Sequence, residues 1–419
     1  MMSEPNLRSN ATSRRRIRVG FVMHKMQIAG AEVLVKQIIQ RLSSEIDPTI
    51  LCLDGVGEIG EQLIAAGTPV ISLGRKPGVD WSMAARLADE FKRRKIEVVH
   101  AHQYSPFFYS AFARRRHGAK SKILFTEHGR HYPDIVSWKR RMVNRFCLWK
   151  YADITTACCD FSTRALRQKE GFDDAFTLRN GVDVSKLPDR GTQADVSQRR
   201  LKLGLDPERK YVACIARLNL IKDHATLIRA WQLVSRQEPD ARLLLVGDGE
   251  ERESLQRQVQ ELGLDQQVEF WGIRNDVGEI LRSVDVFTLT STSEAASLTL
   301  LEAMASGCPA VVTDVGGNAE HLRESKDGFL VPRADHTALA NRLVELLNDE
   351  GKRAEFGAAA RQQVVENFSL EDAIASYLMH YQKLAQTPQT KRTHFLHSAL
   401  EFVRPNRSHF QSGSETVKQ

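Results

Sequence analysis

The stretch VFTLTSTSEAASLTLLEAMASGCPAVVTDVGGNAE, residues 286–320, decides the fold of this protein. It opens with an apolar run at 286–290 that is typical of a buried strand, and a helical pattern follows at 297–306. A second apolar run at 309–313 leads directly into the small residues Gly316-Gly317, which open another helical pattern. This order of strand, helix, strand and helix predicts a parallel sheet with helices packed on its faces.

The same alternation runs through both halves of the chain. In the first half, the expected strands are 17–23, 49–53, 69–73, 97–101, 122–126 and 153–157, and the expected helices are 31–42, 58–66, 81–94, 106–116, 137–151 and 161–169. In the second half, the expected strands are 211–216, 242–246, 267–271, 284–289, 309–313 and 328–331, and the expected helices are 223–236, 250–262, 276–282, 297–306, 317–323, 336–349 and 351–366. We therefore expect an α/β protein with two Rossmann-like, doubly wound domains that face a cleft, with the chemistry in the loops that follow strands.

The chain divides into two domains, a returning helix and two polar tails. The predicted parts are a disordered tail at 1–16, an N-terminal domain at 17–188, a C-terminal domain at 200–368, a helix at 369–387 and a polar, basic tail at 388–419. The stretch 189–199 lacks strong periodicity and is expected to be an irregular linker. Ser369 is the expected N-cap of the last helix, which we expect to pack back on the N-terminal domain.

Composition indicates a globular protein that works in a reducing compartment. Of the 419 residues, 42% are hydrophobic and 26% are charged, which is the balance of a soluble chain. The six cysteines form no C-x-x-C pair, so we expect buried free thiols rather than a zinc site or a disulfide framework. No apolar stretch reaches the roughly 20 residues of a spanning helix, and no signal peptide is recognisable, so we expect a cytoplasmic location.

The formal net charge of +7 comes with local clusters of basic residues. The clustered residues are Arg14, Arg15, Arg16, Arg18, Lys92, Arg93, Arg94, Lys95, Arg114, Arg115, Arg116, Lys139, Arg140 and Arg141. Any single cluster is explained as a solvated helix end. Several clusters in one half favour an anionic partner, such as a phosphate-bearing acceptor or an anionic membrane surface at the inner face of the plasma membrane. No recognised nucleic-acid module is present, so no nucleic-acid partner is expected.

Two glutamates flank a predicted anion-binding helix start. Glu294 lies in the polar loop after a strand, Ser297 is a plausible N-cap, and Glu302 lies about one turn into the helix. The free amides of the first turn can bind phosphate, because the helix dipole adds to their donors. The carboxylates can then accept hydrogen bonds from sugar and ribose hydroxyls. By spacing alone, two glutamates eight apart are also consistent with ordinary surface residues.

The surrounding residues resemble a known family. The run from Glu294 to Glu302, followed by Ala303-Met304-Ala305-Ser306-Gly307-Cys308-Pro309, resembles the E-x7-E signature of retaining glycosyltransferases of family 4, which have the GT-B fold. Further segments resemble family elements in the same order: Ala29-Gly30-Ala31-Glu32, His102, His128, Asn180-Gly181-Val182-Asp183, Ala216-Arg217-Leu218, Lys222, Val246-Gly247-Asp248-Gly249 and Gly316-Gly317-Asn318-Ala319-Glu320. The resemblance extends over about residues 17–385. The chain departs from the family pattern at Ala29, Ala216 and Ala296-Ser297, where glycine or Phe-Gly is usual, so its donor sugar can differ.

The resemblance implies a set of site residues. The implied catalytic residues are Glu294, His128, Arg217 and Lys222; the implied donor-binding residues are Gly30, Arg217, Lys222, Glu294, Ser297, Leu298, Thr299 and Glu302; and the implied acceptor residues are His102, His131 and Tyr132. Arg217 and Lys222 suit a departing diphosphate, because preorganised cations stabilise developing negative charge.

The implied reaction transfers a sugar from a nucleotide-diphosphate sugar to a hydroxyl of a saccharide or lipid-linked acceptor, with retention of configuration, in cell-surface polysaccharide or glycolipid biosynthesis. The chain contains no D-x-D motif, so no metal or other cofactor is expected. A sugar-nucleotide epimerase and a non-catalytic binding protein with the same fold are the alternatives.

Overall fold

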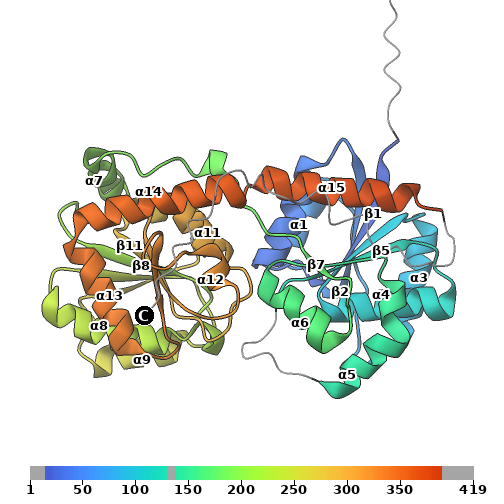
Figure 1. Ribbon diagram of the computed structural model, residues 1–419, viewed down its shortest axis with the longest axis horizontal. Coiled ribbons are helices and arrows are strands. Elements are labelled where there is room, and N and C mark those ends of the chain that lie inside the picture. The colour runs from blue at the N-terminus through green and yellow to red at the C-terminus, as the bar shows by residue number, and fades with distance from the viewer. Residues whose placement is uncertain (1–14, 130–136, 389–419) are drawn as a thin grey trace, which may run out of the picture. The chain divides into compact units, whose positions relative to one another are not determined.

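The described residues of the protein form two parallel β-sheets with covering helices (Figure 1). The computed structural model describes residues 15–129 and 137–388. Within these ranges most strands are short, apolar and almost fully buried, and every residue of Val98–His102 and of Tyr211–Ile215 is shielded from solvent. Strands buried on both faces are expected in parallel sheets, because helices cover each side.

The first sheet contains seven strands in the order β3-β2-β1-β4-β5-β6-β7. Its strands are β1 (Ile17–Lys25), β2 (Ile46–Gly55), β3 (Val70–Ser72), β4 (Val98–His102), β5 (Lys122–Glu127), β6 (Ile154–Ala157) and β7 (Phe176–Thr177). Its helices are α1 (Gly30–Arg41), α2 (Glu58–Ala65), α3 (Ser82–Arg93), α4 (Tyr104–His117), α5 (Trp138–Val143) and α6 (Asp160–Glu170). Short helical turns follow as η1 (Asn144–Leu148), η2 (Trp149–Tyr151) and η3 (Val184–Lys186).

The second sheet contains six strands in the order β10-β9-β8-β11-β12-β13. Its strands are β8 (Tyr211–Ile215), β9 (Arg242–Val246), β10 (Val268–Gly272), β11 (Val286–Leu289), β12 (Ala310–Thr313) and β13 (Gly328–Val331). Its helical elements are α7 (Gln193–Lys202), η4 (Leu220–Lys222), α8 (His224–Gln237), α9 (Arg252–Glu261), α10 (Val277–Ser283), α11 (Leu298–Ala305), α12 (Asn318–His321), α13 (His336–Asn348) and α14 (Glu350–Asn367).

Both sheets reverse their strand order at one point. In the first sheet β1 lies between β2 and β4, and in the second sheet β8 lies between β9 and β11. The loops that leave such neighbouring strands diverge to opposite faces, and ligands bind in the crevice that this divergence creates. The predicted fold class, two doubly wound α/β sheets, is confirmed, and the topology directs attention to the loops after β1, β4, β8 and β11.

The last helix, α15 (Leu370–Gln386), packs on the first sheet rather than on the second. Tyr377 and Tyr381 are fully buried there in one cluster with Phe21 and other side chains of the first sheet. The Tyr381 hydroxyl lies 2.7 Å from His100 Nδ1 on β4. Ser369 Oγ accepts a hydrogen bond from the Asp372 amide at 3.4 Å, so the predicted N-cap is confirmed. The predicted domain boundaries and tails remain proposals.

Two local predictions were wrong. The stretch expected to be irregular at 189–199 contains the start of α7, because Thr192 and Asp195 form a capping box and Val196 and Arg200 provide the buried face. The single helix expected at 137–151 is interrupted, since α5 passes into the π-helical turn η1 and then into η2. Such turns depend on side-chain packing and leave no simple periodic signal.

All six cysteines are free, and five of them are buried, in agreement with the prediction from composition. Across residues 15–129 and 137–388, no helix is long and apolar enough to cross a lipid bilayer.

The contact of α15 with the first sheet yields a stability prediction. Tyr381→Ala should destabilise the protein by about 3–5 kcal/mol, because it leaves a cavity beside Phe21 and removes the partner of His100 Nδ1. Tyr381→Phe should cost only about 1–3 kcal/mol, since it keeps the ring and removes one buried hydrogen bond. Thermal and urea unfolding would measure the loss of stability in both variants. An equal loss in Tyr381→Ala and Tyr381→Phe would contradict the prediction.

Candidate functional site

The loops after β8 and β11 are tied together by backbone and side-chain hydrogen bonds. The Thr292 amide donates to the Ile221 carbonyl at 2.7 Å, and Thr290 Oγ1 donates to the carbonyls of Lys222 and Asp223, each at 3.0 Å. Lys222 Nζ in turn donates to Glu294 Oε2, which also accepts from Ser291 Oγ at 3.0 Å. Lys222 and Glu294 therefore lie within reach of a single bound molecule.

Two glycines support the loop that carries Glu294. Gly316 has a φ of +56°, and a Cβ atom there would lie 1.6 Å from the Glu294 carbonyl oxygen. A Cβ atom on Gly317 would lie 1.8 Å from the Ala295 carbonyl oxygen, and the Gly317 amide donates to Glu294 O at 3.1 Å. Backbone thus packs directly on backbone, and no other residue type fits without moving Glu294.

Helix α11 presents free amides next to this carboxylate. Ser297 Oγ accepts from the Leu300 amide at 3.2 Å, so the predicted N-cap is confirmed. Among the described residues, the amides of Leu298 and Thr299 have no hydrogen-bond partner. Thr299 Oγ1 lies 3.1 Å from Ser297 Oγ and adds a hydroxyl at the same place. Unpaired amides and the positive end of the helix dipole suit an anion such as phosphate.

Glu302 is half-buried one turn into α11. Removal of its carboxyl group from water raises the pKa of Glu302 to about 7. Within 15–129 and 137–388, no side chain forms an ion pair or hydrogen bond with this carboxyl group. A carboxyl group without a partner in a partly dry position is suited to hydroxyl groups of a ligand, which would compensate for its lost hydration.

Arg217 follows β8 and projects into solvent from a rigid turn. The Leu218 amide donates to the Asp248 carbonyl at 3.0 Å, and a Cβ atom on Gly247 would lie 2.0 Å from the Ala216 carbonyl oxygen. The turn after β9 therefore sets the backbone of Arg217. Its side chain is exposed and forms no ion pair in the described part of the chain, so its charge is available to an anion.

The loop after β1 approaches the second sheet. A Cβ atom on Gly30 would lie 3.5 Å from Leu298 Cδ1, which is ordinary contact distance. Packing within the protein therefore does not demand glycine here. Glu32, in the first turn of α1, is buried; burial raises its pKa, and the charge of Arg217 opposes that rise. Glu32 was not among the predicted site residues, although it belongs to the segment Ala29-Gly30-Ala31-Glu32.

Two histidines form a stacked pair at the ends of β4 and β5. His102 Nδ1 and His128 Nε2 lie 2.7 Å apart, and the rings are nearly parallel with centroids separated by 4.9 Å. Burial lowers the pKa of His128 to about 4 and holds the pKa of His102 below its usual value, so both rings are neutral near pH 7. His102 Nε2 and His128 Nδ1 have no partner among the described residues. His128 is the more exposed of the two, since His102 is 1% exposed.

Glu320 links the loop after β12 to α6, a contact that was not predicted from the sequence. Its carboxylate accepts hydrogen bonds from the amides of Asp160 and Phe161, each at 2.6 Å, and so caps α6. Cys158, Cys159 and Ala295 form a small buried cluster beside this contact. A helix cap supplied by a residue 160 positions away leaves no local signal in the sequence.

The structure brings most of the predicted site residues together in two groups. Arg217, Lys222, Glu294, Ser297, Leu298, Thr299 and Glu302 lie on the loops and helix after β8 and β11, Gly30 lies against Leu298, and His102 pairs with His128. His131 and Tyr132 lie outside the described residues. Among the described residues, no group of three His, Cys, Asp or Glu side chains could hold a metal ion.

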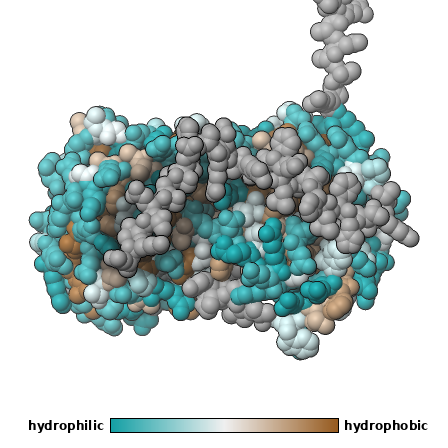
Figure 2. Space-filling view, in the orientation of Figure 1, coloured by the Kyte–Doolittle hydropathy of each residue, from teal (hydrophilic) through white to brown (hydrophobic). Residues whose placement is uncertain are grey.

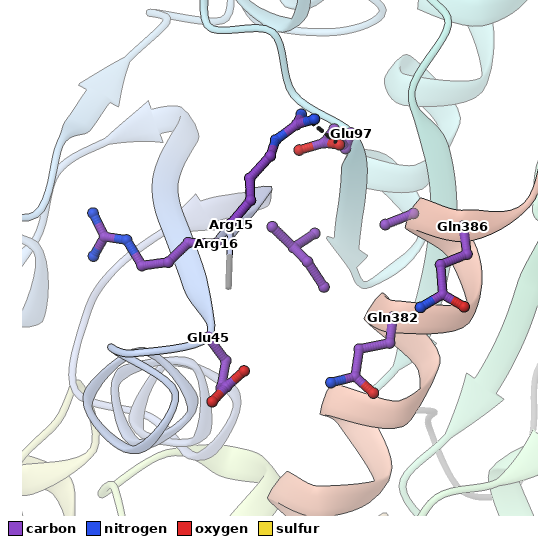
Figure 3. Close-up of a pocket in the computed structure, with 8 residues that line it drawn as sticks. Arg15, Arg16, Glu45, Glu97, Gln382 and Gln386 are labelled. Atoms are coloured by element: carbon purple, nitrogen blue, oxygen red, sulfur yellow. Dashed lines mark hydrogen bonds and ion pairs between the residues drawn. The ribbon is translucent and has the colours of Figure 1, made fainter. Parts of the chain in front are cut away.

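A surface pocket of about 350 Å³ lies elsewhere, at the amino ends of β1 and β2 (Figure 3). Its lining includes Arg15, Glu45 and Gln382, and Figure 3 shows Arg15 turned toward Glu97, with which it pairs at 3.0 Å. The carboxyl ends of the strands carry the site residues, so this pocket is separate from them.

Comparisons with known proteins identify the family of the chain. Residues 195–363 match the family described as "Glycosyl transferases group 1", and residues 28–186 match "Glycosyltransferase Family 4". The chain belongs to the glycosyl transferase group 1 family, whose members are glycosyltransferases with the GT-B fold. It is accordingly a nucleotide-sugar-dependent glycosyltransferase.

Two relatives illustrate the range of the family. The N-acetyl-alpha-D-glucosaminyl L-malate synthase of Bacillus anthracis is 28% identical over 303 residues, which are 72% of this chain and 78% of that protein. The GDP-mannose-dependent monoacylated alpha-(1-6)-phosphatidylinositol monomannoside mannosyltransferase of Corynebacterium glutamicum is 30% identical over 301 residues, which are 69% of this chain and 77% of that protein. Among solved structures, Anabaena HepE in complex with UDP and glucose superposes with a TM-score of 0.76 at 21% identity, over 88% of this chain and 100% of that chain.

The glycine contact behind Glu294 can be tested by substitution. Gly316→Ala should lower kcat/KM for sugar transfer about 10- to 100-fold, because the new methyl group must displace the loop that carries Glu294. Gly118→Ala is the matched control: Gly118 has a φ of +66°, but its Cβ atom would meet nothing within 4 Å. The control should cost about 1 kcal/mol of stability and leave turnover intact. Equal loss of activity in both variants would contradict the prediction that the close contact at Gly316 holds the Glu294 loop in place.

The raised pKa of Glu302 predicts a pH-dependent stability. Its pKa of about 7 in the folded protein lies above the ordinary 4.5, so the folded state binds the proton more tightly than the unfolded state. Relative to Glu302→Gln, the wild-type free energy of unfolding should fall by about 1–3 kcal/mol as pH rises from 4.5 to 7. Urea titrations across this range would measure the difference. Glu261→Gln, at the exposed end of α9, is the control, and parallel curves for wild type and Glu302→Gln would refute the prediction.

Proposed function

We propose that this enzyme transfers a hexose from a nucleotide-diphosphate sugar to a hydroxyl acceptor with retention of anomeric configuration. The observation that carries the proposal is the Lys222–Glu294 pair beside the free amides of α11. Three groups follow each other along a single loop and helix. The carboxylate of Glu294 suits sugar hydroxyls, the amides at the start of α11 suit phosphates, and the half-buried carboxyl group of Glu302 suits a ribose diol.

Charge distribution supports the placement of the diphosphate. Arg217 and Lys222 follow β8, and α11 adds the positive end of its dipole. When the bond between the sugar and the diphosphate breaks, negative charge grows on the leaving oxygen. Fixed cations and amides stabilise this charge more in the transition state than in the ground state, which accelerates the reaction. Arg217 and Lys222 would thus stabilise the leaving diphosphate, a role for which other transferases use a divalent metal.

The proposed reaction proceeds on one face of the sugar. The acceptor hydroxyl attacks the anomeric carbon from the side on which the diphosphate leaves, and the leaving phosphate oxygen takes the acceptor proton. His128 is neutral and half-buried, so it can hydrogen-bond a sugar or acceptor hydroxyl without adding charge. His102 is too deeply buried to touch an acceptor in this arrangement, and we propose that it orients His128. His131 and Tyr132 remain proposed acceptor residues.

The acceptor is proposed to be lipid-linked or otherwise phosphate-bearing. Acceptors differ within the family, since one of the two relatives above is named for malate and the other for a phosphatidylinositol glycolipid. The basic clusters of the first half favour the second kind of acceptor. The enzyme would then act in glycolipid or surface polysaccharide synthesis, in the cytoplasm at the inner face of the plasma membrane.

Substitution of the site residues tests the function. Glu294→Gln should lower turnover about 100- to 1000-fold, because it removes the ionised acceptor of sugar hydroxyls, and Arg217→Ala should have a similar effect through the leaving group. A panel of UDP-, GDP- and ADP-sugars, assayed by release of the nucleoside diphosphate, would identify the donor and provide the measurement.

The controls separate the alternatives. Glu261→Gln and Lys202→Ala, both at exposed positions, should retain full turnover. Release of no nucleoside diphosphate from any donor, despite binding, would favour a non-catalytic binding protein. Conversion of the donor into an isomeric nucleotide sugar would favour an epimerase.

A further inference from the structure

The segment from α5 through η2 carries cationic and apolar side chains and no acidic one. Its sequence is WKRRMVNRFCLWKY, residues 138–151. In Figure 2, brown and pale residues lie beside teal ones at the lower edge of the view, where Figure 1 places α5. None of the residues that the sequence or the geometry assigns to the sugar-transfer site lies in this segment. The sugar-transfer site therefore does not explain why this segment combines cationic and apolar side chains.

One face of the segment is anchored to the protein. Arg140 stacks over the Tyr104 ring at 3.6 Å and pairs with Glu170 at 2.7 Å. Asn144, one turn later, donates to Glu170 at 2.8 Å and accepts from the Tyr104 hydroxyl at 2.8 Å. Leu148 is fully buried another turn on. The spacing of four residues defines the inner face of the helix and leaves the remaining side chains outside.

The outer face exposes large apolar side chains. Trp138 and Phe146 are each 69% exposed, and Met142, Val143 and Trp149 are exposed as well. A water-soluble surface rarely gathers so many large apolar groups within four helical turns, because each exposes area that burial would stabilise. Tryptophan and phenylalanine on a helix that lies flat are typical of the interface between lipid headgroups and acyl chains.

Positive charge surrounds these apolar side chains. Four basic side chains of the segment are exposed, namely Lys139, Arg141, Arg145 and Lys150. None of them forms an ion pair with a residue in 15–129 or 137–388. Unneutralised cations beside apolar groups complement an anionic lipid surface, to which each basic side chain adds attraction. A nucleic acid would engage the cations and stack on the rings, but it would leave Met142 and Val143 in water.

We propose that the outer face of residues 138–150 docks on an anionic lipid bilayer, with Trp138 and Phe146 inserted below the headgroups. The proposal rests on the proposed function in one respect, since a lipid-linked acceptor would lie in that bilayer. The face belongs to the first half of the chain, which is expected to bind the acceptor. Docking would therefore hold the acceptor side of the enzyme at the membrane while the donor arrives from solution.

Vesicle binding tests the apolar contribution. The full-length protein should cosediment with vesicles of phosphatidylglycerol and phosphatidylcholine but not with vesicles of phosphatidylcholine alone. The double variant Trp138→Ala, Phe146→Ala should partition about tenfold or more weakly. The matched control is Leu201→Ala, Ile273→Ala, which removes two side chains that are 64% and 66% exposed elsewhere, and it should bind as the wild type does.

A second pair tests the charge. Arg141→Glu, Arg145→Glu should abolish binding to the anionic vesicles, whereas Lys202→Glu, Lys326→Glu makes the same change of net charge at exposed positions in the second half and should weaken binding only slightly. Equal loss in both pairs would overturn the proposal, because binding would then follow net charge alone. Unchanged binding of the aromatic variant would overturn it as well.

Two further readouts keep this inference distinct from the proposed function. Donor turnover with a soluble acceptor should be the same in all four double variants, so loss of vesicle binding with turnover intact supports docking. Absence of vesicle binding in the active wild type would refute docking and leave the transferase proposal in place. Concentration-dependent dimers that disappear in Trp138→Ala, Phe146→Ala, without vesicle binding, would instead assign the face to a second copy of the chain.

Discussion

Close contact between backbone atoms of two neighbouring loops is the constraint on which the site depends. Gly316 and Gly317 lie so near the carbonyl groups of Glu294 and Ala295 that any side chain would collide with them. This contact fixes the loop after β11, and that loop fixes Glu294, its partner Lys222 and the start of α11. The geometry of the candidate site is thereby set by rigid peptide groups rather than by flexible side chains, which is the condition for preorganised electrostatic stabilisation.

The architecture and the N-cap of the helix after β11 could be predicted from the sequence because their signals are local. Apolar runs marked the strands, and the order of loop, N-cap and helix around Ser297 was confirmed by its hydrogen bond to Leu300. Contacts between distant segments could not be predicted. Glu320 caps a helix that begins 160 residues earlier, and burial raises the pKa of Glu32 while the charge of Arg217, in the other half of the chain, opposes that rise. The capping box of Thr192 and Asp195, by contrast, is a local signal that was missed in a stretch without clear periodicity.

Two sheets with the same topology contribute different chemistry. The loops after β8 and β11 supply cations, amides and carboxylates, which suit a charged diphosphate and a polyhydroxylated sugar. The loops after β4 and β5 supply two neutral histidines, whose burial keeps them uncharged near pH 7. In the proposed function, this histidine pair offers hydrogen bonds without charge, so it does not compete with Arg217 and Lys222 for the diphosphate.

The return of α15 to the first sheet has a consequence for how this polypeptide is made. Tyr377 and Tyr381 complete a core whose other members leave the ribosome much earlier, Val98 by some 280 residues and Phe21 by some 360. The first sheet therefore keeps part of its apolar surface exposed to solvent until α15 has been synthesised, when translation is almost finished. Such a delay lengthens exposure to chaperones and to aggregation, and a premature stop shortly before residue 370 would leave the first sheet, not the second, without its cover.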